Sequence, residues 1–337
     1  MNTETPARLP IIDMHCDLLV YLTDVPGAMQ DNVEEIGCAL PSLAQGNLKL
    51  QVMAIYCATH AGSTDYAKKQ SEAFKLLAEA DNNLTPVTGP DELQLALQAN
   101  TTGMIAAIEN ASGFCEEGEP LEDGFKKLEK MIEDVDRVLY IGMTHSLANR
   151  FGGGNYTTQG ITRDGKMLLD YMHGRHIAID MSHTSDALAY DILEHIDKEK
   201  LDIPVIASHS NFREVWDHAR NLPRELVQEI VHRNGLIGIN FLRSFLNTDE
   251  PEAIFEHIKY GFANGAENAI CFGADYFYTA DEKYADQQPF YFPDLVHAGV
   301  SYSYILKKLH NQLNEAQLHK LSYGNAQQFL ERIWAKP

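Results

Sequence analysis

The stretch HIAIDMSHTSDALAYDILEHIDKEKLDIPVIASHS, residues 176–210, holds two apolar runs separated by a helical segment. The runs 176–183 and 204–210 have the short, β-branched character of buried strands, and residues 185–197 carry apolar side chains at helical spacing. A helix between two strands allows the chain to cross over and start the second strand parallel to the first. The stretch therefore predicts an α/β fold with a parallel sheet.

The same alternation extends in both directions along the chain. Eight runs are predicted strands, namely 11–17, 48–57, 103–110, 138–145, 176–183, 204–210, 236–242 and 269–277. Helical spacing also marks 64–80, 123–136 and 224–234. Eight such units match a closed (β/α)₈ TIM barrel. A doubly wound open sheet is the alternative, but it would usually carry a Gly-rich fingerprint after its first strand, where this chain reads LLVYLTDVPG.

The length and net charge of the chain limit the classes of protein to which it can belong. The chain has 337 residues and a net charge of −21, which argues against a nucleic-acid partner because phosphate binding needs clustered Lys and Arg. No linker or internal repeat marks a second domain, so we expect one barrel domain over residues 1–337 with C-terminal helices. No signal peptide or membrane span is evident, so we expect a cytoplasmic protein without a membrane partner. A homodimer is the commonest assembly for such a protein.

Five cysteines, Cys16, Cys38, Cys57, Cys115 and Cys271, are widely scattered and form no C-x-x-C pair. Their odd number and wide spacing do not indicate a disulfide framework or a zinc finger. We expect reduced thiols that pack mostly as small hydrophobic groups.

Polar side chains end most of the predicted strands. Those strand-end residues are His15, Asp17, Glu109, His145, His183, His209 and Asp275. Only the runs 48–57 and 236–242 lack a strong candidate. In a barrel of this kind the carboxyl ends of the strands meet at one rim, which is where active sites form.

His15 and Asp17 are two residues apart, so alternation along a strand would point both toward the same face and Met14 and Cys16 toward the other. Alone, a His-x-Asp pair is more often a buried hydrogen-bonded pair. Imidazole and carboxylate groups converging from several strands instead favour zinc or a similar divalent metal, with manganese and iron as alternatives. Arg220 follows the run 204–210. An exposed Arg is usually a solvated charge, but above a metal rim its guanidinium could bind a substrate carboxylate.

The segments IIDMHCD, AAIEN, YIGMTHSLANR, IAIDMSHTS, PVIASHSNFREVWDHARNLP and FGAD together resemble the zinc-dependent membrane (renal) dipeptidases, peptidase family M19, in the form of a soluble bacterial-type member. This resemblance spans residues 11–280, and LSYGNAQQFL is similar to the helix that closes the family's fold. It implies an amidohydrolase-like, metal-dependent hydrolase. The implied reaction is hydrolysis of dipeptides, including L-Xaa-D-Xaa, by a hydroxide that bridges two zinc ions.

The resemblance also implies a role for each site residue. One zinc would be held by His15, Asp17 and Glu109, and Glu109 would bridge to a second zinc held by His183 and His209. His145 and Arg220 match substrate-binding positions, and His145 would also stabilise the reacting oxygen. Asp275 matches the carboxylate that transfers protons, so Asp275 and His145 are the expected catalytic residues.

Two departures from the family pattern stand out. Cys16 replaces an asparagine, on the face predicted to point away from the metals. Residues 273–278 read Gly-Ala-Asp-Tyr-Phe-Tyr where the family commonly has Gly-Ser-Asp-Phe-Asp-Gly. The altered loop leaves open a related dizinc amidohydrolase that acts on a lactam, an N-acyl amino acid or a peptide-like metabolite. A binding protein without catalysis is disfavoured because all five ligand positions are retained.

Overall fold

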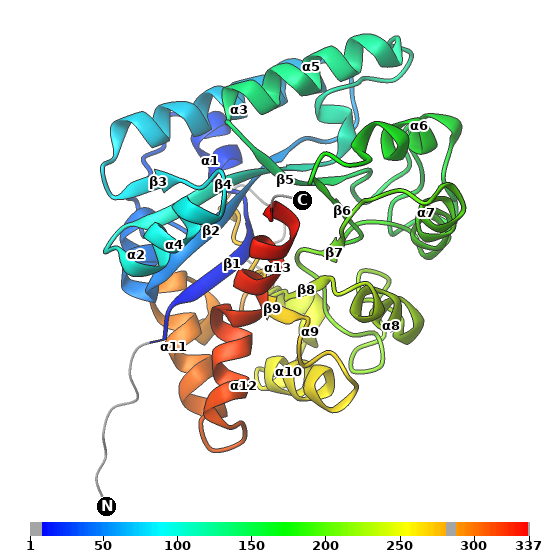
Figure 1. Ribbon diagram of the computed structural model, residues 1–337. Helices are drawn as coiled ribbons and strands as arrows, with labels where there is room; N and C mark the ends of the chain where they lie inside the picture. The colour runs from blue at the N-terminus through cyan, green and yellow to red at the C-terminus, as the bar shows by residue number, and fades with distance from the viewer. Residues whose placement is uncertain (1–8, 281–287, 336–337) are drawn as a thin grey trace, which may run out of the picture.

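A computed structural model describes residues 9–280 and 288–335, and its centre is a closed barrel of parallel strands (Figure 1). The barrel strands are β1 (Ile11–Cys16), β2 (Leu48–Tyr56), β4 (Thr102–Glu109), β5 (Val138–Gly142), β6 (Ala178–Asp180), β7 (Val205–Ala207), β8 (Leu236–Ile239) and β9 (Ile270–Phe272). Pairing of β2 with β4 and of β1 with β9 closes the ring. The predicted (β/α)₈ TIM barrel is confirmed.

Each predicted strand run overlaps one barrel strand, but several strands end earlier than predicted. β6, β7 and β9 have only three residues each. The chain leaves the extended conformation where the polar side chains begin, and Asp275 after β9 even has a φ of +63°. A short strand that the sequence did not indicate, β3 (Leu84–Pro86), pairs with the start of β4.

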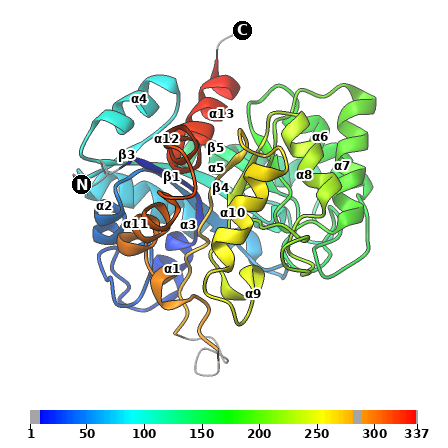
Figure 2. The ribbon, with the colours of Figure 1, turned by 90° about the horizontal axis from the view of Figure 1, so that it is seen from below.

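Helices surround the barrel in both ribbon views (Figures 1 and 2). The four predicted helices are confirmed as α3 (Ser63–Ala80), α5 (Leu121–Asp134), α7 (Asp186–Glu199) and α8 (Arg224–His232). The others in the described residues are α1 (Leu18–Asp24), α2 (Leu40–Gly46), α4 (Pro90–Gln98), α6 (Arg163–Met172), α9 (Arg243–Leu246), α10 (Ala253–Ala263), α11 (Ala298–Leu309), α12 (Glu315–His319) and α13 (Asn325–Trp334). Ser185 caps α7 by accepting a hydrogen bond from the Leu188 backbone N–H.

The predicted alternation along β1 is wrong at one point. A register shift between Asp13 and Cys16 interrupts the pairing of β1 with β2. Met14 therefore packs in an apolar cluster with Phe329 of α13, whereas Cys16 packs with Cys38 in the larger cluster beneath the surrounding helices. An irregularity of this kind re-aims the side chains that follow it. The expectation that Cys16 packs toward the helices is confirmed.

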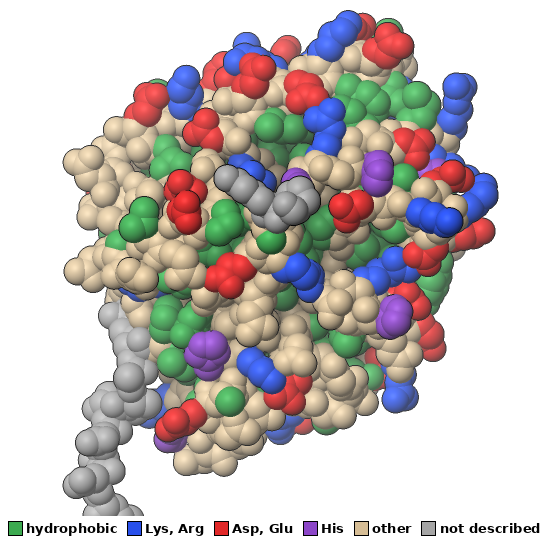
Figure 3. Space-filling view, viewed as in Figure 1, with side chains coloured by type: hydrophobic (Ala, Val, Ile, Leu, Met, Phe, Trp, Pro, Cys, Tyr) green, Lys and Arg blue, Asp and Glu red, His purple; other side chains and the backbone are tan. Residues whose placement is uncertain are grey.

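The described residues contain no helix that combines the length and the apolar character needed to cross a membrane. All five cysteines are buried and free, as predicted. On the face shown in Figure 3, the visible Lys and Arg side chains are interspersed with Asp and Glu rather than gathered in a basic patch.

Candidate active site

A cavity of about 500 Å³ opens where the barrel strands end, and most of the predicted site residues line it. The cavity wall includes Asp17, Glu109, His145, His183, Arg220 and Asp275. His15 and His209 are fully buried and lie against Glu109. The structure thus brings all eight residues singled out in the sequence to one place.

Glu109 stands between two groups of nitrogen and oxygen atoms. One carboxylate oxygen, Oε2, lies 3.4 Å from Nε2 of His15, which in turn lies 3.7 Å from Asp17 Oδ2. The other oxygen, Oε1, lies 2.8 Å from Nε2 of His183 and 3.5 Å from Nε2 of His209. Each group of three offers ligand atoms within 4.8 Å of one another. Glu109 thus belongs to two different groups of potential metal ligands.

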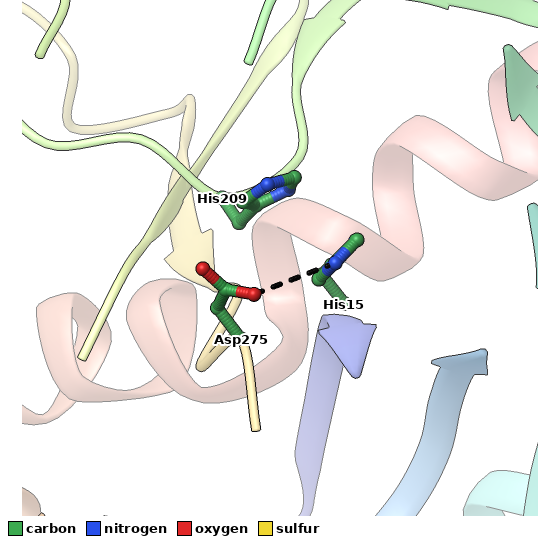
Figure 4. A group of neighbouring side chains, drawn as sticks. All are labelled: His15, His209 and Asp275. Carbon is green, nitrogen blue, oxygen red and sulfur yellow. Dashed lines mark ion pairs between the residues drawn. The ribbon is translucent and has the colours of Figure 1, made fainter. Parts of the chain in front are cut away.

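His15, His209 and Asp275 form a third overlapping group (Figure 4). Oδ1 of Asp275 lies 3.6 Å from Nε2 of His15, and the His15 and His209 rings stack with centroids 3.7 Å apart. Asp275 is therefore close enough to act on an atom held at the centre.

The donor set fits a divalent cation better than it fits hydrogen bonding alone. Nε2 of His15 and Oδ1 of Asp17 are buried without a hydrogen-bond partner among the described residues. Nε2 of His183 and Nε2 of His209 lie 3.0 Å apart. Burial is the main reason why the pKa values of both rings lie well below the usual value. The charge of Arg220 adds to the pKa shift at His183, and the charge of His15 adds to the pKa shift at His209. The neutral imidazoles of His183 and His209, facing the carboxylate of Glu109, are typical of a zinc site.

His145 lies over the second group. Its ring centroid is 4.0 Å from that of His183, and its Nε2 is 3.9 Å from Oε1 of Glu109. Burial and the nearby Arg220 lower the pKa of His145 to about 3. The ring is therefore neutral at physiological pH and keeps one N–H to donate.

Arg220 is buried, which decides against a solvated surface charge. Its Nη1 donates to Ser210 Oγ at 3.0 Å, and its Nη2 donates to the His209 carbonyl at 3.1 Å. The guanidinium also lies over the Phe245 ring, 5.3 Å from its centroid. A fixed, buried cation on the cavity wall is suited to binding a carboxylate.

Asp275 is held by several neighbours. Asn240 Nδ2 donates to its Oδ2 at 2.7 Å, its own backbone N–H donates to the His15 carbonyl at 3.1 Å, and the Tyr291 hydroxyl donates to its carbonyl. Burial raises the pKa of Asp275 to about 7, with His15 opposing the shift and nearby carboxylates adding to it. A carboxyl with this pKa can both accept and release a proton near neutral pH.

A family model for membrane dipeptidase, peptidase family M19, matches residues 3–335. The chain belongs to this family. It is therefore a hydrolase of a metallopeptidase family, and the resemblance seen in the sequence is confirmed.

Three proteins to which the chain is similar share 18% to 26% of the aligned residues with it. An uncharacterized Klebsiella pneumoniae protein in the pqqA 5' region is 26% identical over 217 residues, which cover 60% of this chain and 75% of that protein. Dipeptidase 3 of Mus musculus is 25% identical over 273 residues, which cover 74% of this chain and 52% of that protein. A metallo peptidase of Rhodobacter sphaeroides, solved with a phosphinate mimic of the dipeptide L-Ala-D-Ala, superposes with a TM-score of 0.83 at 18% identity over 97% of this chain and 99% of that one. That superposition shows a common fold.

The loop that departs from the M19 pattern forms part of the cavity wall. Phe277 and Tyr278 line the cavity together with Phe290. The rings of Phe277 and Phe290 lie 5.1 Å apart, and Tyr278 lies 5.4 Å from Tyr21. The substitutions therefore place apolar rings where the family commonly has a carboxylate and a glycine.

Sequence reasoning missed site residues on the two strands that it left without candidates. Asn240, directly after β8, donates to Asp275, and Tyr56, at the end of β2, packs edge-on against His145 with centroids 4.8 Å apart. Both stand at the carboxyl end of a barrel strand. Counting amides and phenols as candidates at these ends would have found them.

Proposed function

We propose that this M19 protein hydrolyses the peptide bond of dipeptides, including L-Xaa-D-Xaa, in the manner of a membrane dipeptidase. His15, Asp17 and Glu109 would hold one zinc, and Glu109, His183 and His209 a second. The observation that carries the proposal is the position of Glu109, whose two oxygens face different donor groups.

When bound, the zinc pair would supply an activated water and a Lewis acid for the scissile carbonyl. The protein's own groups account for the remaining chemistry. His145 donates its N–H to the developing oxyanion, since its lowered pKa leaves it neutral with one hydrogen to give. Asp275, with a pKa of about 7, accepts a proton and passes it to the leaving amine.

Arg220 would bind the carboxylate at the end of the substrate. Its guanidinium is buried and bonded to Ser210 and the His209 carbonyl, which would hold this anchor at one place relative to Glu109. A longer peptide has no carboxylate at that distance from the scissile bond, which explains selectivity for dipeptides. The dipeptide mimic in the Rhodobacter sphaeroides structure supports this substrate class.

The test is an assay of L,L and L,D dipeptides with protein of measured zinc content. Glu109→Ala and Asp275→Asn should each remove activity, because one lacks the shared ligand and the other the proton acceptor. Undiminished hydrolysis by both variants would refute the assignment. Protein that retains well under one zinc per chain after purification with zinc would instead favour a non-catalytic binding protein.

One observation favours a second candidate, a related amidohydrolase acting on another small amide. Phe277 and Tyr278 replace polar or small residues in the cavity wall, which alters the surface that a substrate side chain meets. Zinc-loaded protein that is inert toward the dipeptide panel but cleaves an N-acyl amino acid or a lactam would select this candidate.

A further inference from the structure

One buried carboxylate joins the loops that carry His183 and His209. Asp180 ends β6, and each of these histidines follows a serine that bonds to it. Ser182 donates to Asp180 Oδ1 from its backbone N–H at 3.1 Å and from its Oγ at 2.9 Å. Ser208 donates to Oδ1 from its N–H at 2.8 Å and to Oδ2 from its Oγ at 2.5 Å.

The Ser208 hydroxyl continues this network to the His209 ring, where Oγ lies 2.7 Å from Nδ1. Because the hydroxyl hydrogen goes to Asp180, Oγ is left as an acceptor and Nδ1 must carry the ring hydrogen. The lone pair then sits on Nε2, which faces Glu109 and His183. Ser182 Oγ also accepts the His209 backbone N–H at 3.0 Å, which fixes the loop.

We propose that Asp180 is a positioning residue that sets the tautomer of His209 through Ser208 and holds the loops of His183 and His209 in register for metal binding. This inference rests on the proposed metal centre. Partners behind a ligating histidine commonly fix its tautomer and raise its basicity. Here the partner is Ser208, whose hydroxyl hydrogen is already donated to the buried carboxylate of Asp180.

The arrangement predicts an unusual effect for Asp180→Asn. The Oδ1 position receives two backbone N–H groups, which can only donate, so the asparagine oxygen must occupy it. The amide nitrogen then faces Ser208 Oγ and donates to it. The Ser208 hydrogen must turn to another acceptor, and Nδ1 of His209 at 2.7 Å is nearer than Ser182 Oγ at 3.2 Å. His209 would then carry its hydrogen on Nε2 and lose the lone pair that binds metal.

The experiment measures zinc affinity of the full chain by competition with a chromophoric chelator, together with zinc per chain. Ser208→Ala, which removes the relay without forcing a tautomer, should weaken binding about 10-fold. Asp180→Asn should weaken one site about 100-fold or more, because the wrong tautomer cannot ligate. Adding Ser208→Ala to Asp180→Asn should restore affinity to the level of Ser208→Ala alone.

Thr64→Val is the matched control, since Thr64 donates to the Glu116 carboxylate at 3.0 Å outside the metal groups. It should leave zinc affinity unchanged. A purely structural role for Asp180 would give a double variant no tighter than Asp180→Asn, and that result overturns the proposal. If Asp180→Asn does not fold, unchanged affinity in Ser208→Ala overturns it equally. A wild-type chain that binds two zincs but cleaves no dipeptide refutes only the proposed function, because the readout here is metal affinity.

Discussion

Replacing Asp275 by asparagine should stabilise the metal-free protein while it removes hydrolysis. Burial raises the pKa of Asp275 from 3.8 to about 7. The folded chain therefore binds more protons than the unfolded chain between these values, and its stability falls as pH rises through that window. Above pH 7 the full difference corresponds to roughly 4 kcal/mol against the folded state, at 1.36 kcal/mol per pKa unit. The neutral amide of Asp275→Asn avoids this term.

At pH 5 the unfolded carboxyl is already ionised, and the wild-type residue destabilises the folded state by roughly 2 kcal/mol by the same relation. The stability advantage of Asp275→Asn should therefore grow by roughly 2 kcal/mol between pH 5 and pH 8. Asn240 donates a hydrogen bond to Oδ2 of Asp275. Weakening of that bond in the variant offsets about 1 kcal/mol of the gain at pH 8, where the wild-type carboxylate is charged, and less at pH 5, where the carboxyl is neutral.

Urea unfolding in the presence of a chelator, followed by far-UV circular dichroism at both pH values, measures this difference directly. Added zinc provides the control, because cations near Asp275 favour its ionised form and should reduce the pH dependence of the difference. An advantage that stays constant or shrinks from pH 5 to pH 8 in metal-free protein would show that burial does not hold this carboxyl protonated.

Three further predictions concern substrate and metal binding. Arg220→Lys should raise KM about 10-fold or more for dipeptides but not for their C-terminal amides, because the lysine ammonium cannot bind a carboxylate through two N–H groups as the buried guanidinium can. Equal effects on both substrates would contradict the role of Arg220 as carboxylate anchor. Tyr140→Phe should weaken zinc binding about 10-fold, because the variant loses the hydroxyl that lies 2.7 Å from Nδ1 of His15. Competition with a chelator measures the zinc affinity, and a variant that binds zinc as tightly as wild type would contradict this role of Tyr140. Removal of metal should lower Tm, measured by scanning calorimetry, and added zinc should raise it again with the logarithm of the free zinc concentration; a Tm independent of zinc would exclude binding to the folded state.

Much of the fold could be read from the sequence because each barrel strand is a short apolar run between helical segments. The ends of those strands were less predictable. Asp275 adopts a left-handed backbone and Asn110 has a φ of 79°, so residues that look extended in the sequence leave the sheet. The bulge in β1 was also hidden, because nothing in IIDMHCD shows that Asp13 turns toward Tyr302 of α11, whose hydroxyl donates to it at 2.7 Å.

The candidate site could be found because barrel topology brings strand ends together, so His15, Glu109 and His209 need no contact in sequence to be neighbours. Their supporting partners could not be found in this way. Tyr140 and Asp180 look like ordinary strand residues, and only the three-dimensional register shows which ring nitrogen each one serves. The roles of the site residues, the single-domain organisation, the homodimer and the cytoplasmic location stay predictions.

The helix α13 has a consequence for the order in which the molecule is completed during synthesis. Ile12 and Met14 of β1 share an apolar cluster with Phe329 and Leu330 of α13. The ribosome synthesises β1 well before α13. The apolar side chains of β1 therefore lack their final neighbours until α13 has emerged from the ribosome. We expect the nascent barrel to depend on chaperone protection until its last helix docks.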